Sequence, residues 1–278
     1  MTFDDLPPLR EALALERVRA DKRFGQHFLL DLNVCRRIAR LAGVGAGDTV
    51  LEVGPGPGGL TRALLETGAR VVAVEKDARF SRMLEALTQA AEGRLTIVSA
   101  DALAVDEISL VGATAPVVAN LPYNVGTPLL IKWLTGPFRP RSMTLMFQKE
   151  VARRVVAGPG GGDFGRLAVL AQSLCEARTV MELPARAFTP PPKVDSAVVR
   201  LDPLSDRPPD ARIVAIQTLA KAAFGQRRKM LRSALRDLGG AALCADAGID
   251  PDARAETISV VGFTRLAQAW MARGGSSL

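Results

Sequence analysis

Histidine is almost absent from this sequence of 278 residues, in which His27 is the only one. A Ser-His-Asp enzyme could use no other histidine, and a histidine-rich metal site is excluded. The three cysteines, Cys35, Cys175 and Cys244, are far apart and odd in number. This argues against a disulfide framework and against a zinc site, and it fits a reducing compartment. We therefore expect no metal, and chemistry that depends on a bound organic cofactor.

Long apolar runs are also missing, and none of the runs present is long enough to span a membrane. The N-terminal residues Met1-Thr-Phe-Asp-Asp5 are acidic and lack the apolar stretch of a signal peptide. We expect a cytoplasmic protein with no membrane partner. Basic residues, in contrast, are in excess and give a formal net charge of +7. Such a surplus favours a polyanionic partner such as nucleic acid.

Apolar runs of strand length alternate with segments of helical periodicity in the first two thirds of the chain. Strands are predicted at residues 49–53, 70–75, 95–99 and 116–119, with further candidates at 142–147 and 197–201, and helices at 8–20, 32–41 and 60–66. Strands that alternate with helices indicate an α/β fold with a parallel sheet and helices on both faces.

A domain boundary is predicted near the segment from Asp202 to Asp210, which contains three prolines. Beyond it only helical patterns follow, at residues 211–224, 227–238 and 259–273. We therefore expect a large α/β domain of residues 1–204 and a small C-terminal all-helical domain of residues 205–278.

A glycine-rich turn, Glu52-Val-Gly54-Pro-Gly56-Pro-Gly58-Gly59, follows a predicted strand and opens a helix. Glycines there let the backbone turn sharply and approach a ligand closely, and their spacing also fits the dinucleotide fingerprint. The turn thus leaves a nicotinamide enzyme and an S-adenosyl-L-methionine enzyme both open. Glu75, at the end of the next strand, can accept both hydroxyls of a ribose. Asp101, after the third strand, can bind an adenine amine or equally cap a helix.

The segment Asn120-Leu121-Pro122-Tyr123 directly follows the fourth predicted strand. An exocyclic adenine amine is a poor nucleophile, because its lone pair is delocalised into the ring. Two acceptors, the Asn120 side-chain oxygen and the Leu121 carbonyl, would favour a pyramidal and more nucleophilic nitrogen. Pro122 stiffens the turn, and Tyr123 offers a ring on which the target base can stack.

These motifs together resemble the ribosomal RNA adenine N6-dimethyltransferase family over about residues 21–272. Shared segments also include Lys22-Arg-Phe-Gly-Gln-His-Phe-Leu29, Gln148-Lys-Glu-Val151, Phe188-Thr-Pro-Pro-Pro-Lys-Val-Asp-Ser196 and Ala223-Phe-Gly-Gln-Arg-Arg-Lys229. The resemblance implies a Rossmann-like class I methyltransferase domain, with S-adenosyl-L-methionine bound at His27, Leu29, Gly54, Gly56, Glu75, Asp101 and Asn120. It makes Phe188 the second stacking wall for the base, and most members have asparagine in place of His27.

The family dimethylates N6 of two adjacent adenines near the 3′ end of small-subunit ribosomal RNA during ribosome biogenesis. The implied partner is a precursor of the small ribosomal subunit, and we expect a monomer. RNA contacts are expected from three basic segments: Arg17, Arg19, Lys22 and Arg23; Lys149, Arg153 and Arg154; and Arg227, Arg228, Lys229, Arg232 and Arg236.

Three other functions stay open on the sequence. One is a large-subunit adenine methyltransferase of the antibiotic-resistance type, against which the segment from Ala223 to Lys229 speaks. Another is a nicotinamide dehydrogenase, which a test of donor binding would separate. The last is an RNA-binding assembly factor without catalysis, against which the intact segment from Asn120 to Tyr123 weighs.

Overall fold

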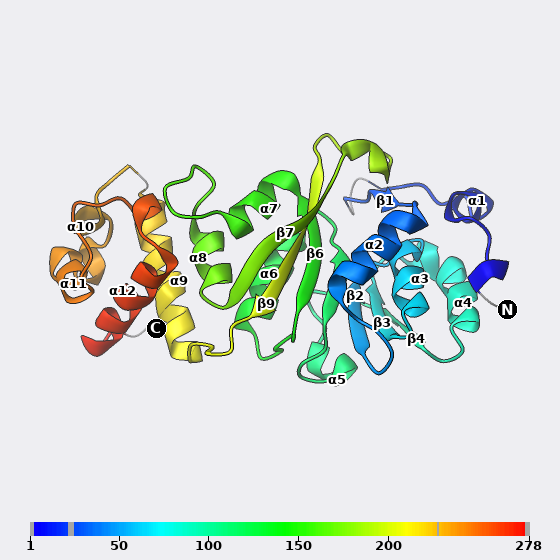
Figure 1. The fold of residues 1–278 in the computed structure, drawn as a ribbon, viewed down its shortest axis with the longest axis horizontal. Coiled ribbons are helices and arrows are strands. Elements are labelled where there is room, and N and C mark those ends of the chain that lie inside the picture. The colour runs from blue at the N-terminus through cyan, green and yellow to red at the C-terminus, as the bar shows by residue number, and fades with distance from the viewer. Residues whose placement is uncertain (1–2, 22–24, 227, 276–278) are drawn as a thin grey trace. The chain divides into compact units, whose positions relative to one another are not determined.

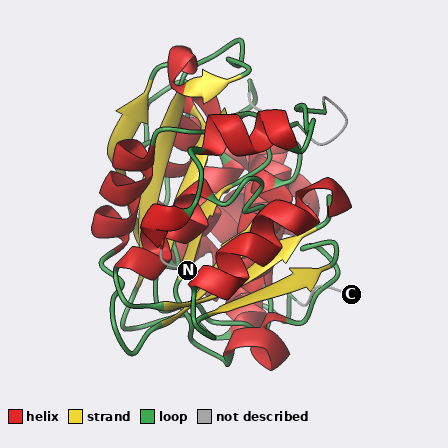
Figure 2. Cartoon of the chain, turned by 90° about the vertical axis from the view of Figure 1, so that its right-hand side faces the viewer, coloured by secondary structure: helices red, strands yellow, loops and turns green. Residues whose placement is uncertain are grey.

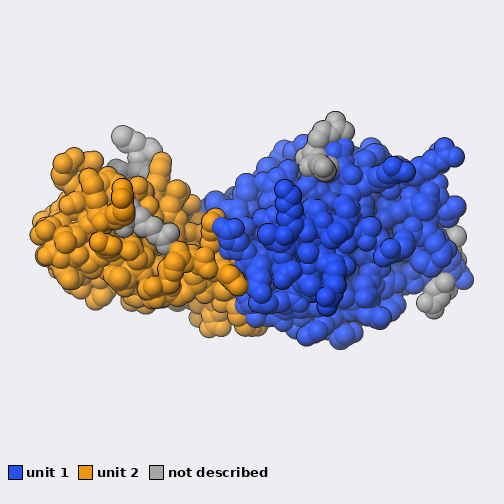
Figure 3. All heavy atoms as spheres, turned by 90° about the horizontal axis from the view of Figure 1, so that it is seen from above, with its two compact units in different colours: residues 1–152, 179–202 blue, residues 153–178, 203–278 orange. Residues whose placement is uncertain are grey.

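A computed structural model describes residues 3–21, 25–226 and 228–275 of the chain. The chain divides into two compact units, one of Met1–Ala152 and Thr179–Asp202 and the other of Arg153–Arg178 and Pro203–Leu278 (Figure 3). The sequence analysis placed residues 153–178 with the larger domain. They join the second unit because Ala168 and Val169 pack in one apolar cluster with Ile216 and Leu219.

A seven-stranded sheet forms the centre of the first unit, in the order β4-β3-β2-β5-β6-β9-β7 (Figure 1). Its strands are β2 (Thr49–Val53), β3 (Arg70–Glu75), β4 (Leu95–Ser99), β5 (Val117–Asn120), β6 (Met143–Gln148), β7 (Cys175–Leu183) and β9 (Ser196–Pro203). Strands β2 to β6 pair in parallel, and β9 runs antiparallel to β6. The predicted α/β fold with a parallel sheet is confirmed.

Helices cover the sheet on both faces, as the burial of β2 requires, since every residue from Val50 to Val53 is buried. They are drawn in Figure 2 around the strands. The helices of the first unit are η1 (Phe3–Asp5), α1 (Leu9–Leu15), α2 (Leu32–Ala42), α3 (Gly59–Glu66), η3 (Ala78–Phe80), α4 (Ser81–Ala90), α5 (Glu107–Val111), α6 (Gly126–Thr135), η4 (Ala185–Ala187) and the start of α7 (Lys149–Val156). A core cluster joins Ile38 of α2 and Leu64 of α3 to Val50 and Val71 of the sheet.

A second, two-stranded sheet pairs β1 (Phe28–Leu29) with β8 (Phe188–Thr189) in antiparallel register. It joins the segment that precedes α2 to the segment that precedes β9. Leu29 lies opposite Phe188, and Phe28 lies opposite Thr189. Residues far apart in the sequence are thereby brought next to the glycine-rich turn.

The second unit is built mainly of helices. These are α8 (Arg166–Gln172), α9 (Asp210–Gly225), α10 (Leu231–Ala234), η5 (Arg236–Leu238), α11 (Gly240–Asp246), η6 (Ala255–Thr257) and α12 (Val260–Ala272). The prediction of one helix over residues 227–238 is wrong for the described residues. Met230 is extended and forms a β-bridge with Arg254, so the helix begins only at Leu231.

Candidate functional site

The carboxyl ends of β2, β3, β4 and β5 border one cavity of about 240 Å³. Parallel strands end at the same edge of a sheet, where ligands of such folds bind. Most of the residues singled out in the sequence line this cavity: His27, Leu29, Gly54, Gly56, Glu75, Asp101, Asn120, Leu121, Pro122 and Tyr123. Phe188 is not among the lining residues.

The glycine-rich turn depends on its glycines for conformation and for space. Gly54, Gly56 and Gly58 have φ angles of 69°, 53° and 87°, which side chains rarely adopt. A Cβ on Gly54 would lie 3.4 Å from the ring of Pro122, and one on Gly59 would lie 2.9 Å from the carbonyl oxygen of Leu29. The turn therefore packs directly against the segment Asn120–Tyr123 and against β1.

Glu75 is fixed by two backbone donors beside this turn. Its Oε2 accepts from the amide of Gly56 at 3.0 Å, and its Oε1 accepts from the amide of Asp77 at 2.8 Å. Burial raises the pKa of Glu75 from its ordinary value. A carboxylate has about four acceptor positions, so both oxygens can still accept from the hydroxyls of a ribose.

Asp101 lines the cavity and also caps the turn that follows β4. Its Oδ1 accepts from the amide of Leu103 at 3.0 Å, and its Oδ2 pairs with Lys76 at 2.8 Å. The hydrogen bond from Lys76 lowers the pKa of Asp101. The helix cap considered in the sequence analysis is not formed, because residues 102–104 make a turn and α5 is capped by Asp106. The carboxylate of Asp101 stays at the cavity wall.

Lys132 of α6 holds the loop that follows Asp101. Its ammonium donates to the carbonyls of Ala102 and Val105 at 3.1 and 2.7 Å and pairs with Glu107 at 2.8 Å. Helix α6 begins three residues after Tyr123. Lys132 therefore connects the loop after Asp101, where the donor's adenine is predicted to bind, to the helix that follows the predicted site of the target base.

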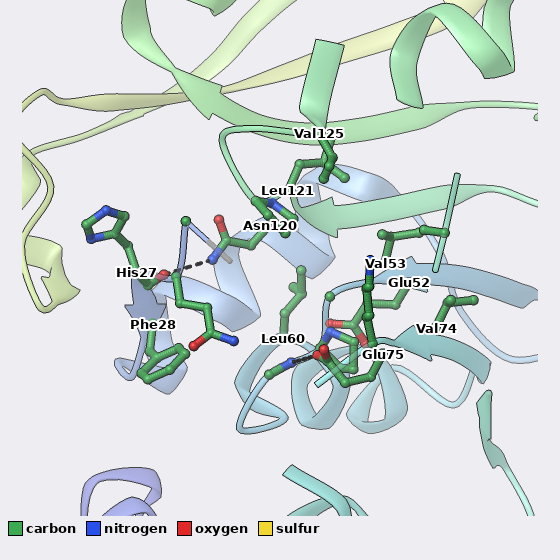
Figure 4. Close-up of a pocket in the computed structure, with 18 of the residues that line it drawn as sticks. His27, Phe28, Glu52, Val53, Leu60, Val74, Glu75, Asn120, Leu121 and Val125 are labelled. Carbon is green, nitrogen blue, oxygen red and sulfur yellow. Dashed lines mark hydrogen bonds between the residues drawn. The ribbon is translucent and has the colours of Figure 1, made fainter. Parts of the chain in front are cut away.

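The side chain of Asn120 is oriented by the main chain of His27. Its Nδ2 donates to the carbonyl oxygen of His27 at 3.4 Å (Figure 4). One of the two N–H groups of the amide is thereby used, and Oδ1 remains as an acceptor. Polarisation of a target amine by this oxygen stays a prediction.

The imidazole of His27 points away from Asn120 and Glu75 (Figure 4). It stacks on the ring of Tyr123, with centroids 5.3 Å apart, and its Nδ1 lies 2.8 Å from the carbonyl oxygen of Pro190. The hydroxyl of Tyr123 bonds the hydroxyl of Ser196 at 2.7 Å. Ser196 is fully buried, so the Tyr123 ring is held from two sides.

Phe188 lies in the core cluster opposite Leu29 and is only 3% exposed. The structure brings it next to β1 without bringing it to the cavity wall. Its role as a stacking wall for the base stays a prediction.

Glu52 is a residue of the site to which the sequence reasoning gave no role. It lines the cavity at 1% exposure, and its Oε2 has no hydrogen-bond partner among the described residues. The pKa of Glu52 is raised to about 8, chiefly by burial; the hydroxyl of Thr61 opposes this rise and the nearby charge of Glu75 contributes to it. The signal in the sequence was an acidic residue inside the buried strand Thr49-Val-Leu-Glu-Val53.

The described residues of the basic segments are largely exposed. Arg153, Arg154, Arg228 and Lys229 lie at the surface, and Lys149 pairs with Glu182 at 2.6 Å. Lys22, Arg23 and Arg227 lie outside the described residues. Within residues 3–21, 25–226 and 228–275, no group of three or more acidic, cysteine or histidine side chains could hold a metal, and no helix could cross a membrane.

Comparison with known proteins gives a consistent result. The family model for ribosomal RNA adenine dimethylase matches residues 17–271. The chain is 64% identical to ribosomal RNA small subunit methyltransferase A of Phenylobacterium zucineum, over 98% of this chain and 96% of that protein. It is 69% identical to the protein of the same name from Caulobacter vibrioides, over 90% and 97% of the two chains.

Two solved structures share the fold. A dimethyladenosine transferase from Plasmodium falciparum matches 91% of this chain and 100% of its own at a TM-score of 0.76 and 24% identity. The 23S rRNA methyltransferase ErmE matches 88% of this chain and 99% of its own at a TM-score of 0.70 and 26% identity.

Proposed function

The chain belongs to the ribosomal RNA adenine dimethylase family, and from this premise we propose that it dimethylates N6 of two adjacent adenines near the 3′ end of small-subunit ribosomal RNA. The methyl donor is S-adenosyl-L-methionine. The observation that carries the proposal is the meeting of two motifs in one cavity: the glycine-rich turn and Asn120–Tyr123. The names of the relatives favour the small subunit over the large one, and they favour an enzyme over a non-catalytic factor.

The cavity fits the donor in three respects. Its glycine-rich turn lines the cavity at Gly54 and Gly56, which present only backbone to a ligand. Glu75 and Asp101 line the cavity as well, and in this proposal Glu75 accepts from the ribose hydroxyls and Asp101 from the adenine amine. Glu52 adds a third carboxyl group to the cavity lining, and its buried Oε2 has no hydrogen-bond partner among the described residues. The donor supplies a methyl group on a sulfonium sulfur, which the target nitrogen can attack directly.

On the side of the target base, the protein positions and polarises the amine. The Asn120 Oδ1 and the Leu121 carbonyl accept its two hydrogens and favour a pyramidal nitrogen. Tyr123 stacks on the base, which must be unpaired or extruded to reach the site. Positioning and electrostatic preorganisation then account for most of the rate. The nitrogen sheds its proton late, so a strong base is not required.

The protein binds the RNA mainly through contacts between phosphates and the basic segments, including Arg228 and Lys229 of the second unit. Such contacts are insensitive to base sequence and weaken as salt rises. We further propose that the enzyme acts in the cytoplasm as a monomer on a precursor of the small subunit.

Two experiments test the proposed function. Calorimetry should show binding of S-adenosyl-L-methionine and none of NAD. Tight NAD binding without any heat from S-adenosyl-L-methionine would refute the methyltransferase function. In a strain that lacks the gene, the two adjacent adenines of small-subunit RNA should lose their methyl groups. Loss of methylation from large-subunit RNA alone would instead support the antibiotic-resistance type.

A further inference from the structure

The loop of residues 101–106, between β4 and α5, carries Asp101 at the cavity wall without being anchored by apolar packing. None of these six residues is buried, and the side chain of Leu103 is exposed. Three of the six form a turn, and the others have no regular structure. A segment with so few buried apolar contacts opens easily unless polar contacts hold it. The contacts that fix the course of this loop are therefore polar.

Asp101 depends on the course of the loop for its direction. Its Oδ1 accepts from the amide of Leu103, and its carbonyl oxygen accepts from the amide of Ala104 at 2.8 Å, which closes the turn. Its carboxylate also pairs with Lys76, but both side chains are exposed. An exposed ion pair holds a side chain only weakly. The backbone of the turn thus directs the carboxylate.

Lys132 of α6 bridges the two sides of this turn. Its ammonium donates to the carbonyl oxygens of Ala102 and Val105, and it pairs with Glu107. Three acceptors match the three protons of an ammonium group. Ala102 lines the cavity beside Asp101, so one of the three interactions acts on the cavity wall itself.

Glu107 keeps the ammonium in place. Its side chain is 5% exposed, and its Oε1 accepts from Lys132 at 2.8 Å and from the indole of Trp133 at 2.7 Å. Both donors belong to α6, and Trp133 is buried. Lys132 itself is partly buried, so water and salt screen its contacts less than those of a surface pair. The helix therefore presents the ammonium at a fixed place.

We propose that Lys132 is a positioning residue for the adenine of the methyl donor: by holding the loop of residues 101–106, it directs the Asp101 carboxylate toward the adenine amine. The inference rests on the proposed function, because it takes the donor's adenine to lie at Asp101. Without Lys132 the carboxylate is still present, but its direction is no longer fixed. Loss of Lys132 should therefore reduce discrimination for the amine rather than abolish binding.

Two ligands that differ at the amine measure this discrimination. S-Adenosyl-L-homocysteine carries the amine, whereas S-inosyl-L-homocysteine carries in its place a carbonyl oxygen, which cannot donate. Calorimetry on the full chain should show the inosyl ligand bound at least about tenfold more weakly, the scale of a lost hydrogen bond to a charged group. In Lys132→Met, which keeps an unbranched side chain without its charge, the ratio of the two affinities should be smaller by about fivefold or more.

Three further variants separate the hold on the loop from other effects. Glu107→Gln keeps the bonds from Lys132 to the two carbonyls, so it should keep the wild-type ratio. Lys132→Met combined with Glu107→Gln leaves no uncompensated buried carboxylate, so it should fold even where the single variant does not, and should show the reduced ratio. Arg200→Met is the matched control, because Arg200 also donates to a carbonyl, that of Ala42, and pairs with Asp202. Arg200 is not among the residues that line the cavity, so this variant should keep the wild-type ratio.

A wild-type ratio in the double variant of Lys132 and Glu107 would overturn the proposal. Equal binding of the two ligands by the wild type would overturn it as well, since there would be no amine contact to position. An equally reduced ratio in Arg200→Met would do the same, because the effect would then be a general loss of stability. A wild-type protein that binds neither ligand would instead refute the proposed function.

Discussion

Replacing Glu52 by glutamine should remove a pH dependence from the stability of the first unit. The pKa of Glu52 is raised from 4.5 to about 8 in the folded protein. Between these values the folded protein keeps a proton that the unfolded chain has lost. Its free energy of unfolding therefore falls as pH rises through this window. Glutamine has nearly the same shape and stays neutral throughout, so the variant should lack this fall.

The size of the effect follows from the two pKa values. A pKa difference of one unit corresponds to about 1.4 kcal/mol. From about pH 5 to about pH 8, the wild type should lose about 3 kcal/mol of unfolding free energy through Glu52 that the variant keeps. Any constant difference between glutamic acid and glutamine cancels when the two pH values are compared.

Urea unfolding at several pH values measures this difference. The chain has two tryptophans, Trp133 in the first unit and Trp270 in the second. In a Trp270→Phe background, the fluorescence of the buried Trp133 reports on the first unit alone. Glu66→Gln is the matched control, because the hydrogen bond from Arg36 lowers the pKa of Glu66. In Glu66→Gln, the free energy of unfolding should still fall from pH 5 to pH 8 as it does in the wild type. Parallel stability curves for Glu52→Gln and the wild type would refute the reasoning.

Three further predictions concern the target base and the RNA. Asn120→Ala should slow methyl transfer by about two to three orders of magnitude while RNA affinity stays near wild type. A wild-type rate in single-turnover kinetics on small-subunit particles would contradict the polarisation role. Tyr123→Phe should keep most activity, because the stacking ring remains and only a hydrogen bond of about 1 kcal/mol is lost. Adding Ser196→Ala to it should change target affinity no further, and an additive loss would show that the two hydroxyls act separately. Replacing Arg228 and Lys229 by alanine should flatten the salt dependence of RNA binding, by about one unit of slope per lost phosphate contact. An unchanged slope would show that neither touches RNA.

The strands that border the cavity were predictable because each is a short run rich in apolar residues. Thr49–Val53, Arg70–Glu75 and Leu95–Ser99 begin and end as predicted. Strand β7 was missed because most of its residues are not buried, so its sequence shows no such run. The helix predicted over residues 227–238 failed at Met230, whose pairing with Arg254 is a tertiary contact that local periodicity does not report.

In the site, too, local sequence patterns predicted the positions of residues but not their tertiary contacts. Gly54, Glu75 and Asn120 could be singled out because each lies at the carboxyl end of a strand, and parallel strands place these ends together. The partners of their side chains could not be predicted. The missing partner of Glu52 depends on which cations the fold brings near it, and the bond between Tyr123 and Ser196 joins segments more than seventy residues apart.

The contact between Asn120 and position 27 bears on which side chains this position can carry. The atom that Asn120 contacts is the main-chain oxygen of His27, and every amino acid carries that oxygen. A histidine therefore makes this contact as well as the expected asparagine would, because the backbone alone supplies the acceptor. The contact constrains the path of the chain toward Asn120 and leaves the side chain of His27 to stack on Tyr123. An unusual residue here is consequently a poor sign of lost activity.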